Sequence, residues 1–216
     1  MDWFGKFEGG NTMTTEGARR LTMKERPIPF RGQGVRAILA GSQTMTRRLV
    51  RLRAGEIAHE GDDGSLHAVA NTTWGDCIER VIQCPYGVPG DLLWVRETWA
   101  ENIDGDVVYR ADNGVAESMI DRWRPSIFMP RWASRLTRRI TSVRVERVRE
   151  ITEEDARAEG AHRSHQGDRP HFSRHPVPNG THRLGFVHIW DAINAARGFG
   201  WDANPWVWVV GFEVVQ

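Results

Sequence analysis

The stretch Ile140-Thr141-Ser142-Val143-Arg144-Val145-Glu146-Arg147-Val148 alternates between two sets of side chains. In a β-strand the even-numbered set, from Ile140 to Glu146, would point to one face, and the odd-numbered set, with Val143 and Val145, to the other. The alternation predicts a strand with one face in water. The segments before and after this stretch extend the same β-rich pattern.

Three further segments predict strands, namely residues 92–99, 107–109 and 206–215. In the last of these, even-numbered apolar residues from Trp206 to Phe212 would share one face, and we expect Trp206 and Trp208 to belong to the core. The prolines of residues 27–32 favour an extended segment there.

Short helices are predicted between these strands. Apolar spacing followed by Gly41 indicates a helix over residues 33–40. Thr152 would cap a second helix that runs to about Glu159 and ends at Gly160. Phe186, Ile189, Trp190 and Ile193 mark a third, amphipathic helix that ends near Gly198.

Many short strands with a few interposed helices, and no β-α-β rhythm, indicate an α+β fold. We predict a small mixed β-barrel of about five to seven short strands with a few short helices packed on it. Residues 1–22 are expected to form a flexible leader and residues 23–216 a single domain. Loop insertions are expected near residues 54–80 and 161–182.

Composition excludes several classes of protein. The chain of 216 residues has only Cys77 and Cys84, which is too few for a disulfide framework or a structural zinc site. It contains no apolar run long enough to span a membrane and no secretory signal pattern. We therefore expect a cytoplasmic protein without a cofactor. The sequence leaves its oligomeric state open.

The basic residues are almost all arginines, and they are clustered. Residues 122–149 contain nine arginines with Glu146 as the only acid. Acids gather elsewhere, so a chain of net charge +1 could still present one basic face. Ten tryptophans accompany the arginines, and that combination suits either a packed core or the stacking of nucleic-acid bases.

Five histidines crowd the second insertion, but their spacing fits no standard metal template. We expect no metal site there. The residues are His162, His165, His171, His175 and His182.

The octapeptide Gly41-Ser42-Gln43-Thr44-Met45-Thr46-Arg47-Arg48 resembles the signature of the ASCH superfamily, Gly-x-Lys-x-x-Glu-x-Arg. Gly41 and Arg48 match it, whereas Gln43 stands at the lysine position and Thr46 at the acidic position. Further segments are similar to a phage and prophage branch of that superfamily, and the resemblance covers roughly residues 24–215. They are residues 24–28, 84–87, 89–99, 123–126, 130–135 and 201–206.

The resemblance implies a PUA-like fold, which in related domains binds RNA. One branch of small ASCH proteins hydrolyses N4-acetylcytidine with the signature lysine, a threonine three residues later and a glutamate on a later helix. Thr46 matches the threonine and Glu159 the glutamate, but Gln43 replaces the lysine. Glutamine cannot accept a proton near neutrality, so the substitution removes the expected general base. Whether the chain is an enzyme stays open at this point.

Our first hypothesis is therefore a phage-encoded protein that binds RNA or a modified nucleoside. The alternatives are an amidohydrolase acting on N4-acetylcytidine-like nucleosides, a ribonuclease, and an accessory protein that acts through protein contacts. We expect Gln43, Thr46, Arg48 and Glu159 to converge around one basic cavity sized for a nucleobase. The remaining candidates for binding phosphate, carbonyl oxygens or bases are Trp94, Arg96, Glu97, Trp99, Arg131, Trp132 and Arg135. Arg96 and Glu97 equally fit a pair on a sheet surface.

Overall fold

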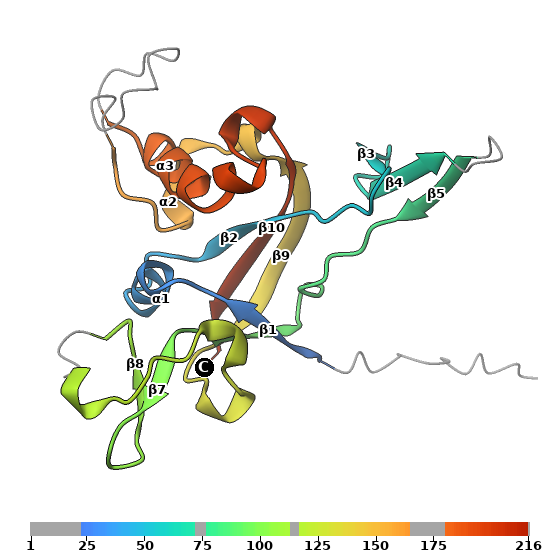
Figure 1. The fold of residues 1–216 in the computed structure, drawn as a ribbon. Coiled ribbons are helices and arrows are strands. Elements are labelled where there is room, and N and C mark those ends of the chain that lie inside the picture. The colour runs from blue at the N-terminus through green and yellow to red at the C-terminus, as the bar shows by residue number, and fades with distance from the viewer. Residues whose placement is uncertain (1–22, 72–76, 113–116, 165–179, 216) are drawn as a thin grey trace, which may run out of the picture.

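The structure is a computed structural model that describes residues 23–71, 77–112, 117–164 and 180–215. Its main element is a five-stranded sheet in the order β1-β6-β9-β10-β2 (Figure 1). Only the β1–β6 pair is parallel. The strands are β1 (Glu25–Pro29), β6 (Leu92–Arg96), β9 (Thr137–Arg147), β10 (Trp206–Val214) and β2 (Met45–Leu49).

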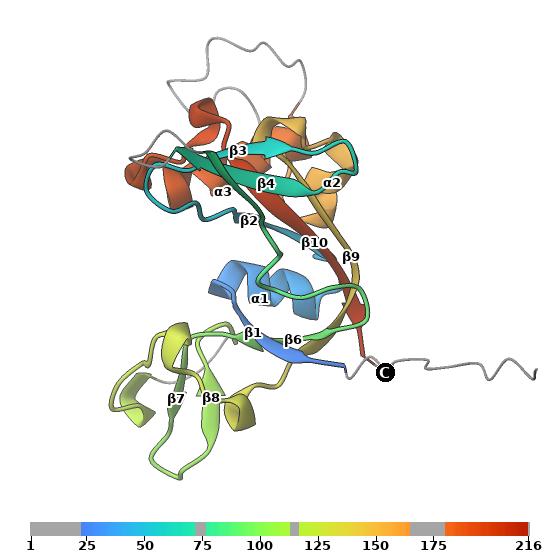
Figure 2. The same cartoon turned by 90° about the vertical axis from the view of Figure 1, so that its right-hand side faces the viewer.

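Three α-helices accompany the sheet, and the predicted α+β class is confirmed. Helices α2 (Glu153–Ala158) and α3 (His182–Asn194) pack together on one side of it, whereas α1 (Gly32–Leu39) lies on the other side, between β1 and β2 (Figures 1 and 2). Helices α1 and α2 lie within one residue of their predicted bounds, whereas α3 begins before Phe186 and ends at Asn194, four residues before Gly198.

Within the described residues, two smaller sheets raise the number of strands to ten, above the predicted number. Within residues 54–80, β3 (Ile57–Glu60), β4 (Leu66–Asn71) and β5 (Cys77–Val81) form an antiparallel sheet that projects from the body (Figure 1). At the opposite end, β7 (Trp99–Glu101) pairs with β8 (Val107–Tyr109). The predicted strand over residues 92–99 is thus divided between β6 and β7.

The main sheet is not closed into a barrel by hydrogen bonds among the described residues, and β1 and β2 remain its edges. A side chain connects these edges instead: Nη2 of Arg48 in β2 donates to the carbonyl oxygen of Pro29 in β1 at 2.7 Å. The predicted barrel is therefore an open sheet whose two edges are bridged by Arg48.

The sheet separates two apolar cores. Trp208, Val210 and Phe212 of β10 belong to the core on the α1 side, and Trp206 packs against it, so the predicted shared face is confirmed. The intervening residues Val207 and Val209 belong to the core beneath α2 and α3. Strand β10 is buried on both faces because apolar layers cover both sides of the sheet.

A β-bulge changes the predicted alternation of β9. The pairing with β10 shifts between Gly211 and Phe212, and Thr141 is the extra residue. Ile140 therefore lies in the same core as Val143 and Val145, and its predicted place on the even-numbered face is wrong. An extra residue reverses the side-chain parity beyond it, which local periodicity does not reveal.

The caps confirm the predicted start and end of α2, whereas α3 ends at Asn194 and a 3₁₀ turn continues to Gly198. The Thr152 hydroxyl accepts a hydrogen bond from the backbone N–H of Asp155 at 3.1 Å. Gly160, which follows α2, has a φ of +72°, and Gly198 ends the turn after α3 with a φ of +81°. Both glycines occupy the left-handed conformation that favours residues without a Cβ.

We expect Gly160→Ala to be more destabilising than Gly198→Ala. A Cβ at Gly160 would lie 2.9 Å from Cβ of Ala37, whereas one at Gly198 would meet nothing within 4 Å. Both variants carry about 1 kcal/mol of left-handed strain, and Gly160→Ala adds about 1–3 kcal/mol of overpacking. Urea unfolding of both variants measures the difference. Equal losses would contradict the close packing of α1 against the end of α2.

The predicted leader (1–22) and most of the second insertion (165–179) lie outside the described residues. Of the helices that the structure describes, none is long and apolar enough to cross a lipid bilayer.

Candidate functional site

The octapeptide leads into β2, where its backbone meets the end of α2. Gln43 and Glu159 form an isolated antiparallel bridge, and the N–H of Thr44 donates to the carbonyl oxygen of Ala158 at 2.9 Å. The buried Gln43 side chain donates through Nε2 to the carbonyl oxygen of Met45 at 3.1 Å. These contacts hold the signature segment directly against the residue identified as the candidate glutamate.

Thr46 and Arg48 are two positions apart in β2, so their side chains point to the same face of the sheet. Thr46 is buried, and within the described residues its hydroxyl has no hydrogen-bond partner. The Arg48 guanidinium lies over the ring of Phe30, with Cζ 4.7 Å from the ring centroid. While Nη2 of Arg48 bonds to Pro29, its Nε is buried without a partner.

Glu159 is the acid of this site. Its side chain is 7 % exposed, and Oε1 accepts a hydrogen bond from Nη1 of Arg47 at 3.2 Å. Burial raises the pKa of Glu159 to about 7, although the charges of Arg47 and Arg48 act in the opposite direction. A carboxyl with such a pKa exchanges its proton near neutrality, as a general acid or base requires.

Three of the four residues predicted to converge, Gln43, Arg48 and Glu159, lie near one another where β2 meets the end of α2. Gln43 and Glu159 are bridged through their backbones, and Arg48 interacts electrostatically with Glu159. Thr46 lies between Gln43 and Arg48 along the chain. The nucleobase-sized cavity between them stays a prediction.

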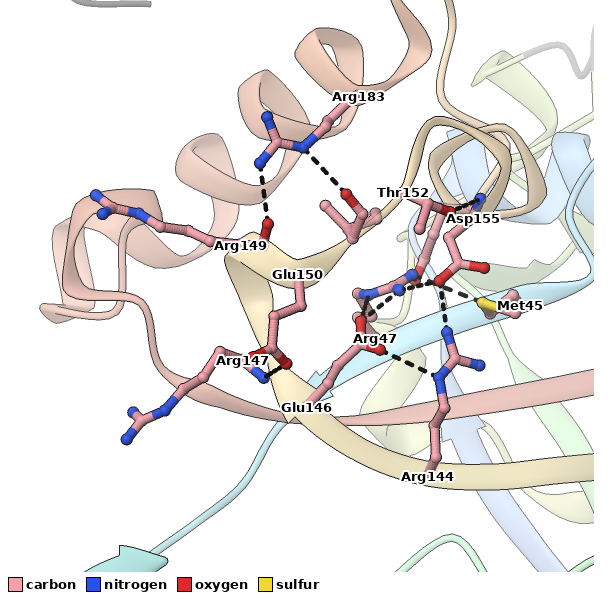
Figure 3. A network of polar contacts seen from close by, with 12 residues as sticks. Met45, Arg47, Arg144, Glu146, Arg147, Arg149, Glu150, Thr152, Asp155 and Arg183 are labelled. Carbon is pink, nitrogen blue, oxygen red and sulfur yellow. Dashed lines mark hydrogen bonds and ion pairs between the residues drawn. The ribbon is translucent and has the colours of Figure 1, made fainter. Parts of the chain in front are cut away.

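Arg47 was not among the predicted site residues, yet it is the most extensively paired cation of the region (Figure 3). Its side chain is 0 % exposed and binds carboxylates from two further elements, Glu146 of β9 and Asp155 of α2. The Nε–Oε1 distance to Glu146 is 2.8 Å. Arg144 reaches the same two carboxylates from the solvent side. We call these five residues the Arg47 network: Arg47, Arg144, Glu146, Asp155 and Glu159.

The alternation of β2 could have indicated Arg47. Strand parity places Arg47 on the face opposite to Thr46 and Arg48, where α2 packs. Its acidic partners lie 99 to 112 residues away along the chain, so no local pattern joins them. Asp155, three residues after the Thr152 cap, bonds to Arg47 and Arg144 through its side chain.

Seven of the predicted binding residues lie away from this neighbourhood. They belong to β6, to β7, to the two-residue link between these strands and to the turns that precede β9, at the end of the sheet opposite α2 and α3 (Figures 1 and 2). These residues are Trp94, Arg96, Glu97, Trp99, Arg131, Trp132 and Arg135.

Glu97 is buried and pairs with Arg135, not with its neighbour Arg96. Nε and Nη2 of Arg135 donate to the two oxygens of Glu97 at 2.9 and 3.1 Å, and Arg135 also binds Asp112. Burial raises the pKa of Glu97, against the effect of Arg135. Trp99 is only 1 % exposed, so it offers no free ring face, whereas Trp132 is 67 % exposed.

The predicted basic face is largely neutralised. Most arginines of residues 122–149 lie beside acids from other segments, as Arg131 does with Glu25 and Arg149 with Asp202. Acids that are distant in the sequence therefore do not occupy a separate face, because the fold brings them to the arginines.

The described residues contain no group of histidine, cysteine or acidic side chains that could hold a metal ion. Three histidines of the second insertion, His165, His171 and His175, lie outside those residues. Comparisons with protein-family models, with curated proteins and with solved structures found no match to this chain.

Proposed function

We propose that this chain is an ASCH-type protein that binds a modified nucleoside, free or within RNA, at Gln43, Thr46, Arg48 and Glu159. The observation that carries the proposal is the buried Nε of Arg48 without a partner. Buried polar groups are almost always hydrogen-bonded, so an unpaired guanidinium N–H beside buried polar side chains supports a ligand or water atom at this position.

The chemistry of the four side chains suits the edge of a nucleobase. Gln43 and Thr46 can each donate and accept, and Arg48 donates to carbonyl oxygens. Glu159, with a pKa of about 7, can accept a hydrogen bond when ionised and donate one when protonated. Such a set matches a base that presents both an exocyclic nitrogen and a carbonyl oxygen.

Thr46→Val tests the proposal because it removes only a hydroxyl. That hydroxyl has no partner within the described residues, so stability should be unchanged or slightly higher. Binding of cytidine or N4-acetylcytidine, measured by calorimetry, should weaken about 2- to 12-fold, the value of one hydrogen bond. Ser42→Ala, on an exposed residue of the same segment, is the control. Failure of the wild type to bind both cytidine and N4-acetylcytidine at low salt would refute the proposal.

An amidohydrolase is the second candidate, and the raised pKa of Glu159 favours it. Glu159 would take the Thr46 proton while Oγ attacks the acetyl carbonyl carbon of N4-acetylcytidine. The proton would pass to the amine as the N4–acyl bond breaks, and water would then release acetate from Thr46.

Incubation with N4-acetylcytidine separates the two candidates. If the wild type releases acetate and Thr46→Val does not, the chain is an enzyme. If only Gln43→Lys releases acetate, the chain is a binding protein whose site lacks the base. Both cysteines are free, and we place either activity in a reducing cytoplasm as part of the proposal.

A further inference from the structure

Arginine and tryptophan side chains lie next to one another across β6, β7 and the turns before β9. The Trp94 ring lies between two guanidinium groups, with Cζ of Arg96 at 5.3 Å and Cζ of Arg131 at 5.9 Å from its centroid. Arg131 precedes Trp132 in the sequence. The Trp132 ring packs edge-on against the Trp99 ring, with their centroids 5.7 Å apart. The guanidinium of Arg124 lies over the Trp99 ring, with Cζ 4.7 Å from the ring centroid. We call this series the arginine–tryptophan ladder: Arg96, Trp94, Arg131, Trp132, Trp99 and Arg124.

Large apolar side chains of the ladder and of the turn beside it are exposed to solvent. Trp132 and Phe128 are each 67 % exposed, and Ile127 is also exposed. They lie in two short 3₁₀ turns, Ser126–Phe128 and Arg131–Ala133. Grouped exposed aromatic residues indicate an interaction surface, because a single chain gains nothing from leaving them in water.

The backbone beneath these aromatic residues is anchored. Arg96 donates through Nε to the carbonyl oxygen of Met129 at 3.1 Å and through Nη2 to that of Ile127. Met129 and Trp99 are themselves buried in a small core under the turns. The surface is therefore held in place before any partner arrives, which lowers the entropic cost of binding.

The charge of the ladder favours a polyanion. Arg131 pairs with Glu25 and Arg124 with Glu101, but all four side chains are more than 40 % exposed. Exposed ion pairs of this kind contribute about 0–1 kcal/mol, so a phosphate can replace the carboxylate at little cost. Arg96 has no acidic partner within the described residues.

We propose that the arginine–tryptophan ladder is a binding surface for single-stranded nucleic acid. Bases stack on Trp132 and Phe128, and phosphates contact Arg96, Arg124 and Arg131. Stacking on aromatic faces combined with guanidinium–phosphate contacts is how sequence-tolerant single-strand binding is achieved. The surface lies at the opposite end of the sheet from the Arg47 network and does not depend on the proposed nucleoside site.

The test uses an unmodified oligouridine of about 12 nucleotides, with binding followed by tryptophan quenching and anisotropy in about 50 mM salt. Trp132→Ala should weaken binding about 5- to 150-fold, and Trp132→Phe should weaken it less. Arg131→Ala should lower the slope of log affinity against log salt by about 0.7. Urea unfolding should show that these variants of exposed residues remain folded.

Matched controls lie outside the ladder. Phe199→Ala removes an exposed aromatic residue, and Arg139→Ala an exposed arginine whose acidic partner, Glu213, is 3.8 Å away. Both should leave oligouridine binding unchanged, as should Thr46→Val. No binding by the wild type, or equal losses in ladder and control variants, would overturn the inference.

Two further outcomes would also overturn it. If Trp132→Ala changes self-association in sedimentation velocity but not oligouridine affinity, the surface is a protein interface. If Thr46→Val abolishes oligouridine binding together with nucleoside binding, there is one site and not two. If the wild type binds oligouridine but neither cytidine nor N4-acetylcytidine, only the proposed function is refuted.

Discussion

Arg47→Met should lower the free energy of unfolding by about 3–5 kcal/mol, the largest effect that we expect from a single substitution. The Arg47 side chain is 0 % exposed, and its three carboxylate partners are 7 to 18 % exposed. Methionine would fill much of the volume but leave Glu146, Asp155 and Glu159 close together without their shared cation. Removing one member of a buried ionic cluster leaves uncompensated charge in a medium that solvates it poorly.

Arg144→Met is the matched control because Arg144 binds two of the same carboxylates, Glu146 and Asp155. The Arg144 side chain is 42 % exposed, so water can replace it, and we expect a loss below about 1 kcal/mol. Urea unfolding of both variants at pH 7 and constant salt measures the two losses. Similar losses would show that burial of Arg47 does not determine the strength of the network.

The second large effect is a pH dependence that Glu159→Gln should abolish. The pKa of Glu159 is raised from 4.5 to about 7 by burial, so between these values the folded protein retains a proton that the unfolded chain has lost. Stability therefore falls as pH rises through this window and levels off above it. For the wild type we expect a loss of about 2–3 kcal/mol between pH 5 and 8 from this group.

Glutamine is neutral throughout, so the stability of Glu159→Gln relative to the wild type should increase by that amount from pH 5 to pH 8. Glu154→Gln, on an exposed residue of the same helix, should leave the wild-type pH profile intact. The measurement is urea unfolding at pH 5, 6, 7 and 8 for the three proteins. A wild-type profile that rises with pH in parallel with Glu159→Gln would mean that Arg47 and Arg48 outweigh burial and keep Glu159 ionised.

The pH prediction and the functional proposals concern the same carboxyl but can fail separately. Unfolding measurements report the titration of Glu159 whether or not a ligand exists. If the pH effect is present and nucleoside binding is absent, the raised pKa is a consequence of packing α2 against β2. If both are present, a ligand that contacts Glu159 should shift the midpoint of its titration.

Local patterns in the sequence predicted the positions of most of the helices and strands of the main sheet correctly. Helix α1, the Thr152 cap of α2 and the shared face of Trp208, Val210 and Phe212 follow from spacing over fewer than ten residues. The signature octapeptide also directed attention to Gln43, which the structure places beside Glu159. Such features depend on neighbours along the chain, which is why the sequence displays them.

The sequence by itself thus determined the α+β class, the helix ends and the candidate residues at the start of β2. Only the tertiary structure decided that Arg47 joins β2, β9 and α2, that a bulge at Thr141 turns Ile140 into the core, and that Arg48 bridges the sheet edges. It also separated the tryptophans of the ladder from the Gln43 site. The physical reason is distance along the chain: burial and ion pairing are set by partners about a hundred residues away, and these partners leave no periodic trace in the local sequence.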